Sequence, residues 1–151
     1  MILKDFTEFK SLLGTTLKPS AWLEVEQEMI DHFAAATKDY QWIHVDQQRA
    51  EKESPYKATI AHDFMSIALI PKFLTEVLDV SSLKMAYNYG LEEVRFPYPV
   101  VEGSFLRGIV QVESIEDQKF NSLKIVWKVT VEIKGARKPA CVGKMITIVY
   151  E

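Results

Sequence analysis

The sequence has little cysteine, no long apolar run and no block of like charge. Cys141 is the one cysteine in 151 residues, which excludes an internal disulfide and argues against a structural metal site. It lies in the apolar segment Ala-Cys-Val, which favours a packed side chain over a nucleophile. No apolar run approaches the roughly 20 residues that cross a bilayer, and the N-terminus lacks the pattern of a secretory signal. We therefore expect a cytoplasmic protein with no membrane segment.

Acidic and basic residues are mixed along the chain. The 21 acidic and 18 basic residues give a net charge of −3, and this mixture does not indicate a nucleic-acid partner. Repeats, linkers and low-complexity segments are absent as well. With 48% apolar residues in 151, the chain has the size and composition of one domain with a substantial core. We predict a single domain over residues 1–151.

The first half of the sequence predicts helices and the second half predicts strands. Three segments have apolar residues at helical spacing, namely residues 5–13, 26–37 and 63–78, and residues 47–53 are expected to form one or two further helical turns. Segment 63–78 is apolar over more than one stripe, so we expect it to be a buried central helix, with Pro71 as a kink or a boundary. Four segments rich in Val, Ile, Phe and Tyr predict strands, namely residues 85–96, 104–116, 120–133 and 141–150. Helices followed by long strands indicate an α+β fold with an antiparallel sheet.

The segment that follows the second predicted helix contains an aspartate and a histidine five residues apart, Asp39 and His44. On a helix the two would lie roughly 140° apart, and on a strand they would face opposite sides of the sheet. They can therefore meet only on a bent loop, where a carboxylate and an imidazole can hold one water molecule. The apolar lining of that loop would come from Tyr40, Trp42 and Ile43. This pattern suggests acid/base chemistry in an apolar pocket.

Five patterns extend over nearly the whole chain, the segment of Asp39 and His44 among them: Trp22-Leu23-x-Val25-x-Gln27, Asp39-x-Gln41-Trp42-Ile43-His44-Val45-Asp46, Ile60-Ala61-His62, Tyr87-Asn88-Tyr89-Gly90-Leu91 and Val94-Arg95-Phe96-Pro97-x-Pro99-Val100. In these patterns the chain resembles the MaoC-like dehydratases, the hydratase-2 group of hot-dog proteins, and within them the branch similar to nodulation protein N. The resemblance implies a hot-dog fold, a long antiparallel sheet wrapped around a central helix. It also implies a homodimer, which would cover an edge or a face of the sheet.

The resemblance further implies an activity and its residues. MaoC-like hydratases add water reversibly to a trans-2-enoyl thioester, carried by coenzyme A or by an acyl carrier protein, and form the (3R)-hydroxyacyl thioester. Their catalytic pair falls on Asp39 and His44, and no metal or redox cofactor is implied. The thioester oxygen is expected at the backbone N–H of Asp63. Ser66, about one helical turn further on, and Trp42 are the other expected substrate-binding residues.

Two residues depart from the family pattern, because Lys38 and Asp63 stand where the family has glycine. A carboxylate at position 63 would repel the enolate that forms on the substrate, unless Lys38 and Asp63 offset each other as an ion pair. Asp63 also suits the role of an N-cap or first-turn acid. His62 is expected to be structural, either holding the loop or capping the helix. We therefore predict a hydratase with weakened or altered activity.

Two alternatives to a hydratase stay open. The first is a hot-dog thioesterase in which Asp63 acts as base or nucleophile on the thioester carbonyl. The second is a non-catalytic acyl-CoA-binding module.

Overall fold

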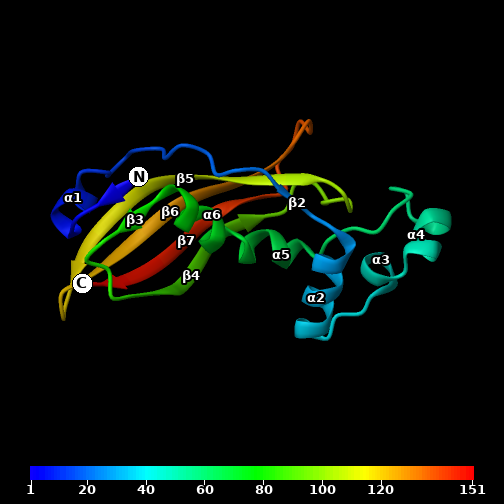
Figure 1. Ribbon diagram of the computed structural model, residues 1–151, viewed down its shortest axis with the longest axis horizontal. Coiled ribbons are helices and arrows are strands. Elements are labelled where there is room, and N and C mark those ends of the chain that lie inside the picture. Colours follow the sequence, from blue (N-terminus) through cyan, green and yellow to red (C-terminus); the bar gives the residue numbers. More distant parts are fainter.

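Five strands form one antiparallel sheet in the order β2-β5-β6-β7-β4 (Figure 1). Their bounds are β2 Leu23–Glu24, β4 Met85–Arg95, β5 Phe105–Gln118, β6 Ser122–Ile133 and β7 Cys141–Tyr150. The computed structural model describes residues 1–151 and also contains a short parallel pair, β1 (Ile2–Leu3) with β3 (Asp79–Val80). The predicted α+β class with an antiparallel sheet is confirmed.

The central strand β6 shows why these segments become strands. Every second residue from position 123 to position 131 is at most 2% exposed, and these residues are Leu123, Ile125, Trp127, Val129 and Val131. The residues between them are more exposed. This alternation is the period of two expected when one face of a sheet covers the core.

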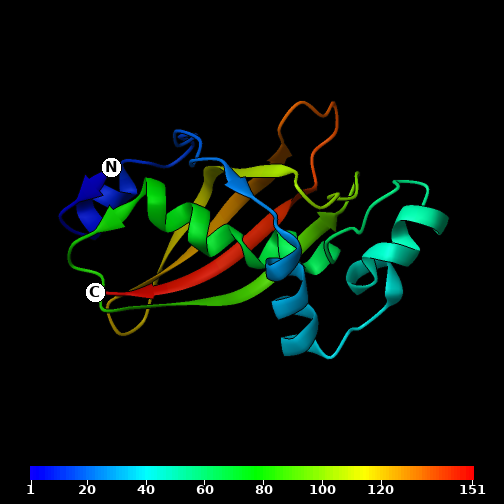
Figure 2. The ribbon, with the colours of Figure 1, turned by 45° about the vertical axis from the view of Figure 1, so that its right-hand side comes forward.

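The helices are α1 Phe6–Lys10, α2 Gln27–Thr37, α3 Trp42–Val45, α4 Gln47–Glu53, α5 Asp63–Ala68 and α6 Ile70–Val77. Helices α5 and α6 run along one face of the curved sheet, whereas α2, α3 and α4 gather beyond one end of it (Figure 2). None of the helices is long and apolar enough to cross a membrane.

The predicted central helix is divided into α5 and α6 at Leu69. Pro71 lies in the first turn of α6, where its missing N–H costs no intrahelical hydrogen bond. Pro71 therefore marks a boundary between two helices and not a kink within one helix.

Helix α6 is packed directly against β5 through a glycine. Phe73 of α6 is 1% exposed, and a Cβ atom placed on Gly108 of β5 would lie 2.6 Å from the Phe73 Cβ. A side chain at position 108 would therefore push the helix away from the sheet. The glycine fixes the spacing between the central helix and the strands.

The turn that joins β5 to β6 lies further along the chain than the sequence indicated. The predicted strands 104–116 and 120–133 would place it at residues 116–120, but β5 continues to Gln118, and the chain reverses through Phe120 and Asn121, which have φ angles of 62° and 51°. Glu116 pairs with Lys124 across the two strands at 3.7 Å. Opposite charges on facing strands stabilise the ladder, which explains why the polar residues of this segment belong to a strand.

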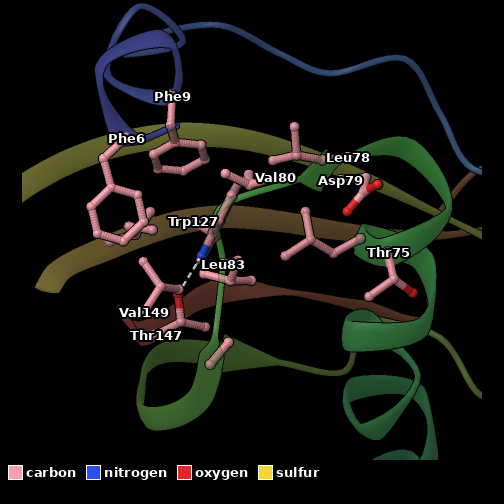
Figure 3. Close-up of a pocket in the computed structure, with 13 residues that line it drawn as sticks. Phe6, Phe9, Thr75, Leu78, Asp79, Val80, Leu83, Trp127, Thr147 and Val149 are labelled. Atoms are coloured by element: carbon pink, nitrogen blue, oxygen red, sulfur yellow. Dashed lines mark hydrogen bonds between the residues drawn. The ribbon is translucent and has the colours of Figure 1, made fainter. Parts of the chain in front are cut away.

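An apolar cavity of about 330 Å³ lies between α1, the C-terminal end of α6 and the sheet (Figure 3). Phe9 of α1 packs against Trp127 there, with 5.9 Å between ring centroids, and the Trp127 indole N–H donates to the Thr147 hydroxyl at 2.8 Å. Asp79 is the one acidic or basic residue of its lining. The cavity therefore lacks the pair of groups that acid/base chemistry needs, and it lies at the opposite end of α5 and α6 from Asp63.

Candidate active site

The end of α2 brings Asp39 and His44 together. Helix α2 ends at Thr37, and its C-cap residue Lys38 has a left-handed conformation, with φ of 63° and ψ of 20°, which reverses the chain direction. Asp39 follows on a short irregular segment, whereas His44 lies on the one-turn helix α3. The expectation of a bent loop is therefore right for Asp39 and wrong for His44.

Asp39, His44 and His62 are neighbours in the structure. One carboxylate oxygen of Asp39 and one ring nitrogen from each histidine lie within 4.8 Å of one another. Two atoms that each hydrogen-bond one water molecule at ordinary distance and tetrahedral angle are about 4.6 Å apart. The separation between the carboxylate and the imidazoles therefore suits one shared water.

A backbone carbonyl fixes the tautomer of His44. The His44 Nδ1 lies 2.6 Å from the carbonyl oxygen of Ile60, and a carbonyl oxygen only accepts hydrogen bonds. The ring proton of neutral His44 is therefore on Nδ1, and its Nε2 is a hydrogen-bond acceptor. Because the side chain is buried at 7% exposure, this orientation is well constrained.

His62 connects Asp39 to His44. Its Nε2 lies 3.0 Å from the backbone carbonyl oxygen of Asp39 and 3.8 Å from the Asp39 carboxylate. Its ring is stacked on that of His44, with 3.8 Å between centroids. The expected loop-holding role agrees with these contacts. The capping role does not, because the His62 side chain accepts no hydrogen bond from α5.

Asp63 is the first residue of α5, with His62 as the N-cap residue. Its backbone is helical and needs no glycine, and N–H groups in the first turn of a helix have no partner within it. Asp63 is therefore a first-turn acid and not the N-cap. Burial raises the pKa of its carboxyl above the ordinary value of 3.8, and the nearby His44 offsets part of that rise.

The suggested ion pair between Lys38 and Asp63 is wrong. Neither residue takes part in any ion pair of the structure. Lys38 caps the far end of α2, where the reversal of the chain directs it to solvent. The carboxylate of Asp63 is therefore not neutralised by this lysine.

Ser66 and Trp42, the other expected substrate-binding residues, lie on α5 and α3. Ser66 is 1% exposed. Trp42 is half-buried, and the guanidinium of Arg49 lies 4.3 Å from its ring centroid. Trp42 is therefore covered on one face by α4, which leaves less of the ring for a substrate than expected.

Sequence reasoning gave no role to Gln27, which supports the site from α2. Its side-chain amide donates to the backbone carbonyl of His44 at 2.8 Å, and its carbonyl oxygen accepts from the hydroxyl of Thr59. The glutamine thereby ties α3 to the segment that leads into α5. The signal in the sequence that could have indicated this role is the place of Gln27 in the pattern Trp22-x4-Gln27.

Cys141 is packed as expected. It is fully buried at the start of β7, and this burial, together with the charge of Asp63, raises the thiol pKa to about 11. The thiol is therefore protonated at neutral pH and is a poor nucleophile.

The two histidines and Asp39 are not arranged to hold a metal ion. The imidazole rings are stacked, with 3.8 Å between centroids and 23° between planes, so their in-plane lone pairs lie in two separate and nearly parallel planes and do not converge on one point. A metal needs lone pairs that converge, at roughly 2.0–2.2 Å for zinc. The nitrogens used by the Ile60 and Asp39 carbonyls are also engaged already.

Comparison with known proteins identifies the family. The family described as MaoC like domain matches residues 8–134. This chain belongs to the MaoC-like family. It is 42% identical over 143 residues to 3-hydroxyacyl-thioester dehydratase Z of Mycobacterium tuberculosis, covering 95% of this chain and 94% of the dehydratase. It is 39% identical over 146 residues to nodulation protein N of Rhizobium leguminosarum, covering 96% and 91%.

Solved structures agree with the hot-dog fold expected of the MaoC-like family. The unliganded R-hydratase PhaJ1 of Pseudomonas aeruginosa superposes with a TM-score of 0.73 at 23% identity, covering 92% of this chain and 82% of the hydratase. The resemblance inferred from the sequence patterns is thus confirmed for both family and fold. The two departures from the family's glycines differ in kind, because only Lys38 has a conformation that favours glycine.

The left-handed backbone conformation of Lys38 gives a testable consequence for stability. A left-handed conformation costs a residue with a Cβ about 1–2 kcal/mol, and the greater freedom of glycine in the unfolded chain offsets part of any gain. We expect Lys38→Gly to raise the free energy of unfolding by roughly 0.5–1 kcal/mol, measured by urea denaturation. Lys38→Ala removes the charge but keeps the strain, so it should give no gain. Equal stability of the two variants would contradict the strain.

Proposed function

We propose that this MaoC-like protein is a hydro-lyase that adds water reversibly to trans-2-enoyl thioesters and forms (3R)-hydroxyacyl thioesters. The observation that carries the proposal is the pair formed by Asp39 and His44, whose polar atoms lie within 4.8 Å of each other, close enough for one bridging water. The names of a related dehydratase and of a structurally similar R-hydratase support the same reaction class.

The tautomer of His44 suggests how the water is activated. With its Nδ1 proton donated to Ile60, His44 presents the Nε2 lone pair, and the Asp39 carboxylate is also an acceptor. A water between them would donate one hydrogen to each and turn an oxygen lone pair toward C3 of the substrate. His44 takes a proton as the C3–O bond forms and then returns it to C2. The hydroxyl and the proton of one water are thereby both accounted for.

The start of α5 would bind the thioester oxygen. As water adds at C3, negative charge develops on this oxygen. The backbone N–H of Asp63 lies at the positive end of the helix, and one such donor contributes roughly 3 kcal/mol to the transition state. The Asp63 carboxylate, which has no cationic partner, opposes this stabilisation.

The two alternatives have less support. A thioesterase based on Asp63 would leave the arrangement of Asp39, His44 and His62 without a role. A non-catalytic binding module would need neither the fixed tautomer of His44 nor the spacing of the pair.

A homodimer is part of the proposal. Strand β4 lies at an edge of the sheet, and its large apolar side chains are 42–62% exposed, namely Met85, Tyr87, Tyr89 and Leu91. An unpaired apolar edge of this length pairs readily with another strand. A second copy is the occupant we propose, with β4 against β4. The thioester is carried by coenzyme A or by an acyl carrier protein.

Hydration itself is measured by loss of the conjugated enoyl absorbance when the protein is added to short and medium trans-2-enoyl-CoAs, with free thiol monitored in parallel. We expect absorbance to fall without thiol release. Asp39→Asn and His44→Gln should each lose at least about 10²-fold in kcat, because each removes an acceptor of the water. Thiol release would support the thioesterase instead, and no change in either signal would support the binding module.

The Asp63 carboxylate should slow hydration. Asp63→Asn keeps the shape and the backbone N–H, and Asp63→Gly restores the residue of the family. We expect either to raise kcat by about 5- to 30-fold at neutral pH, which corresponds to an electrostatic cost of roughly 1–2 kcal/mol. Because burial raises the pKa of Asp63, the wild-type carboxyl is neutralised at a higher pH than an ordinary aspartate. The advantage of Asn should therefore shrink as the pH falls. A pH-independent advantage, or none at all, would count against charge repulsion.

The dimer is tested by sedimentation equilibrium. The wild type should have the mass of two chains, and Leu91→Lys should shift it toward one chain, since a charge on the edge strand opposes pairing. Phe120→Lys is the matched control, because Phe120 is 87% exposed in the turn between β5 and β6 and is not part of the edge strand β4. A one-chain mass for the wild type would exclude the dimer.

A further inference from the structure

We infer that His62 is a positioning residue that holds both Asp39 and His44 in their working orientation; this rests on the proposed hydratase function. Neither the catalytic pair nor the proposed oxyanion donor includes this side chain. His62 nevertheless lies between them, as the residue before Asp63 and the ring neighbour of His44.

The first contact of His62 fixes the peptide of Asp39. Its Nε2 is 3.0 Å from the Asp39 carbonyl oxygen, so this nitrogen carries the proton and donates it. Asp39 lies on an irregular segment, and the solvent-exposed position of its side chain gives it little packing. The hydrogen bond from the buried His62 ring therefore fixes the orientation of the Asp39 backbone, which the irregular segment does not fix by itself.

The second contact fixes the ring plane of His44. The rings of His44 and His62 are stacked, and on α2 Phe33 lies 5.1 Å from His62, measured between ring centroids. The Ile60 carbonyl determines only where the His44 Nδ1 points. The stack restricts rotation about that hydrogen bond, so the direction of the His44 Nε2 depends on His62.

The burial of His62 indicates that its imidazole is kept for this purpose. The residue is 4% exposed, and its Nδ1 is buried without any hydrogen-bond partner in the chain. A buried polar atom without a partner is unfavourable for folding. A phenylalanine would keep an aromatic ring at this position without that cost, but it could not donate to Asp39. Stability and function therefore make opposite demands at this position.

These opposite demands define the experiment. His62→Phe keeps an aromatic ring beside His44 and removes the N–H donor, whereas His62→Gln keeps an N–H near the position of Nε2 and removes the ring. We expect His62→Phe to unfold at the same or a higher temperature than the wild type. Its kcat should fall by about 10- to 100-fold with KM within about two-fold, since displacement of reacting groups by an ångström costs rate at this scale.

The conservative variant and a surface control complete the set. His62→Gln should retain more kcat than His62→Phe, because it can still donate to the Asp39 carbonyl. His32→Gln, on the exposed side of α2, should match the wild type. The inference is overturned if His62→Phe keeps its kcat within two-fold, if its loss of kcat follows a loss of folded protein, or if Gln falls as far as Phe.

A spectroscopic measurement tests the placement independently of turnover. The chain has three histidines, so ring-nitrogen NMR spectra can be assigned with the His32, His44 and His62 variants. We expect the wild-type proton on Nε2 of His62 and on Nδ1 of His44, and a shift of the His44 signals in His62→Gln. A His62 proton on Nδ1 would overturn the inference even in an active enzyme. If the wild type hydrates no enoyl thioester, the proposed function fails, and these tautomers still decide the placement.

Discussion

The hydrogen bond from His44 Nδ1 to the Ile60 carbonyl is the contact on which the candidate site depends. It joins α3, which follows the irregular segment of Asp39, to the chain that leads into α5. The backbone of the same two segments is joined by the bond from the Ile60 N–H to the Ile43 carbonyl at 3.0 Å. Because the imidazole has one proton when neutral, committing it to Ile60 leaves the other nitrogen as an acceptor. One backbone carbonyl thus sets both position and chemistry.

The strands could be predicted from the sequence because apolar and polar residues alternate along a strand such as β6. This alternation shows which side chains face the core without any knowledge of the neighbouring strands. The pair of Asp39 and His44 could be named from spacing and resemblance, but its surroundings could not. His62 donates to a backbone carbonyl 23 residues away, and Gln27 to one 17 residues away. Backbone carbonyls carry no residue-specific signal, so such contacts become visible only when the path of the folded chain is known.

The two substitutions of the family's glycines show that one sequence signal can have two physical meanings. At Lys38 the backbone is left-handed, so the substitution costs conformational energy and leaves the chemistry untouched. At Asp63 the backbone is helical, so the cost is electrostatic and falls on the reaction. Sequence comparison treats the two departures alike, whereas the φ angles separate an effect on folding from one on rate.

The buried Cys141 has a practical consequence. With its thiol enclosed at the start of β7 and its pKa at about 11, the native protein presents no reactive thiolate to alkylating reagents. A cysteine introduced at an exposed position, such as Phe120 in the turn between β5 and β6, would then be the one accessible thiol. The natural chain therefore serves as a background for single-site attachment of fluorophores or spin labels, with its own cysteine left in place.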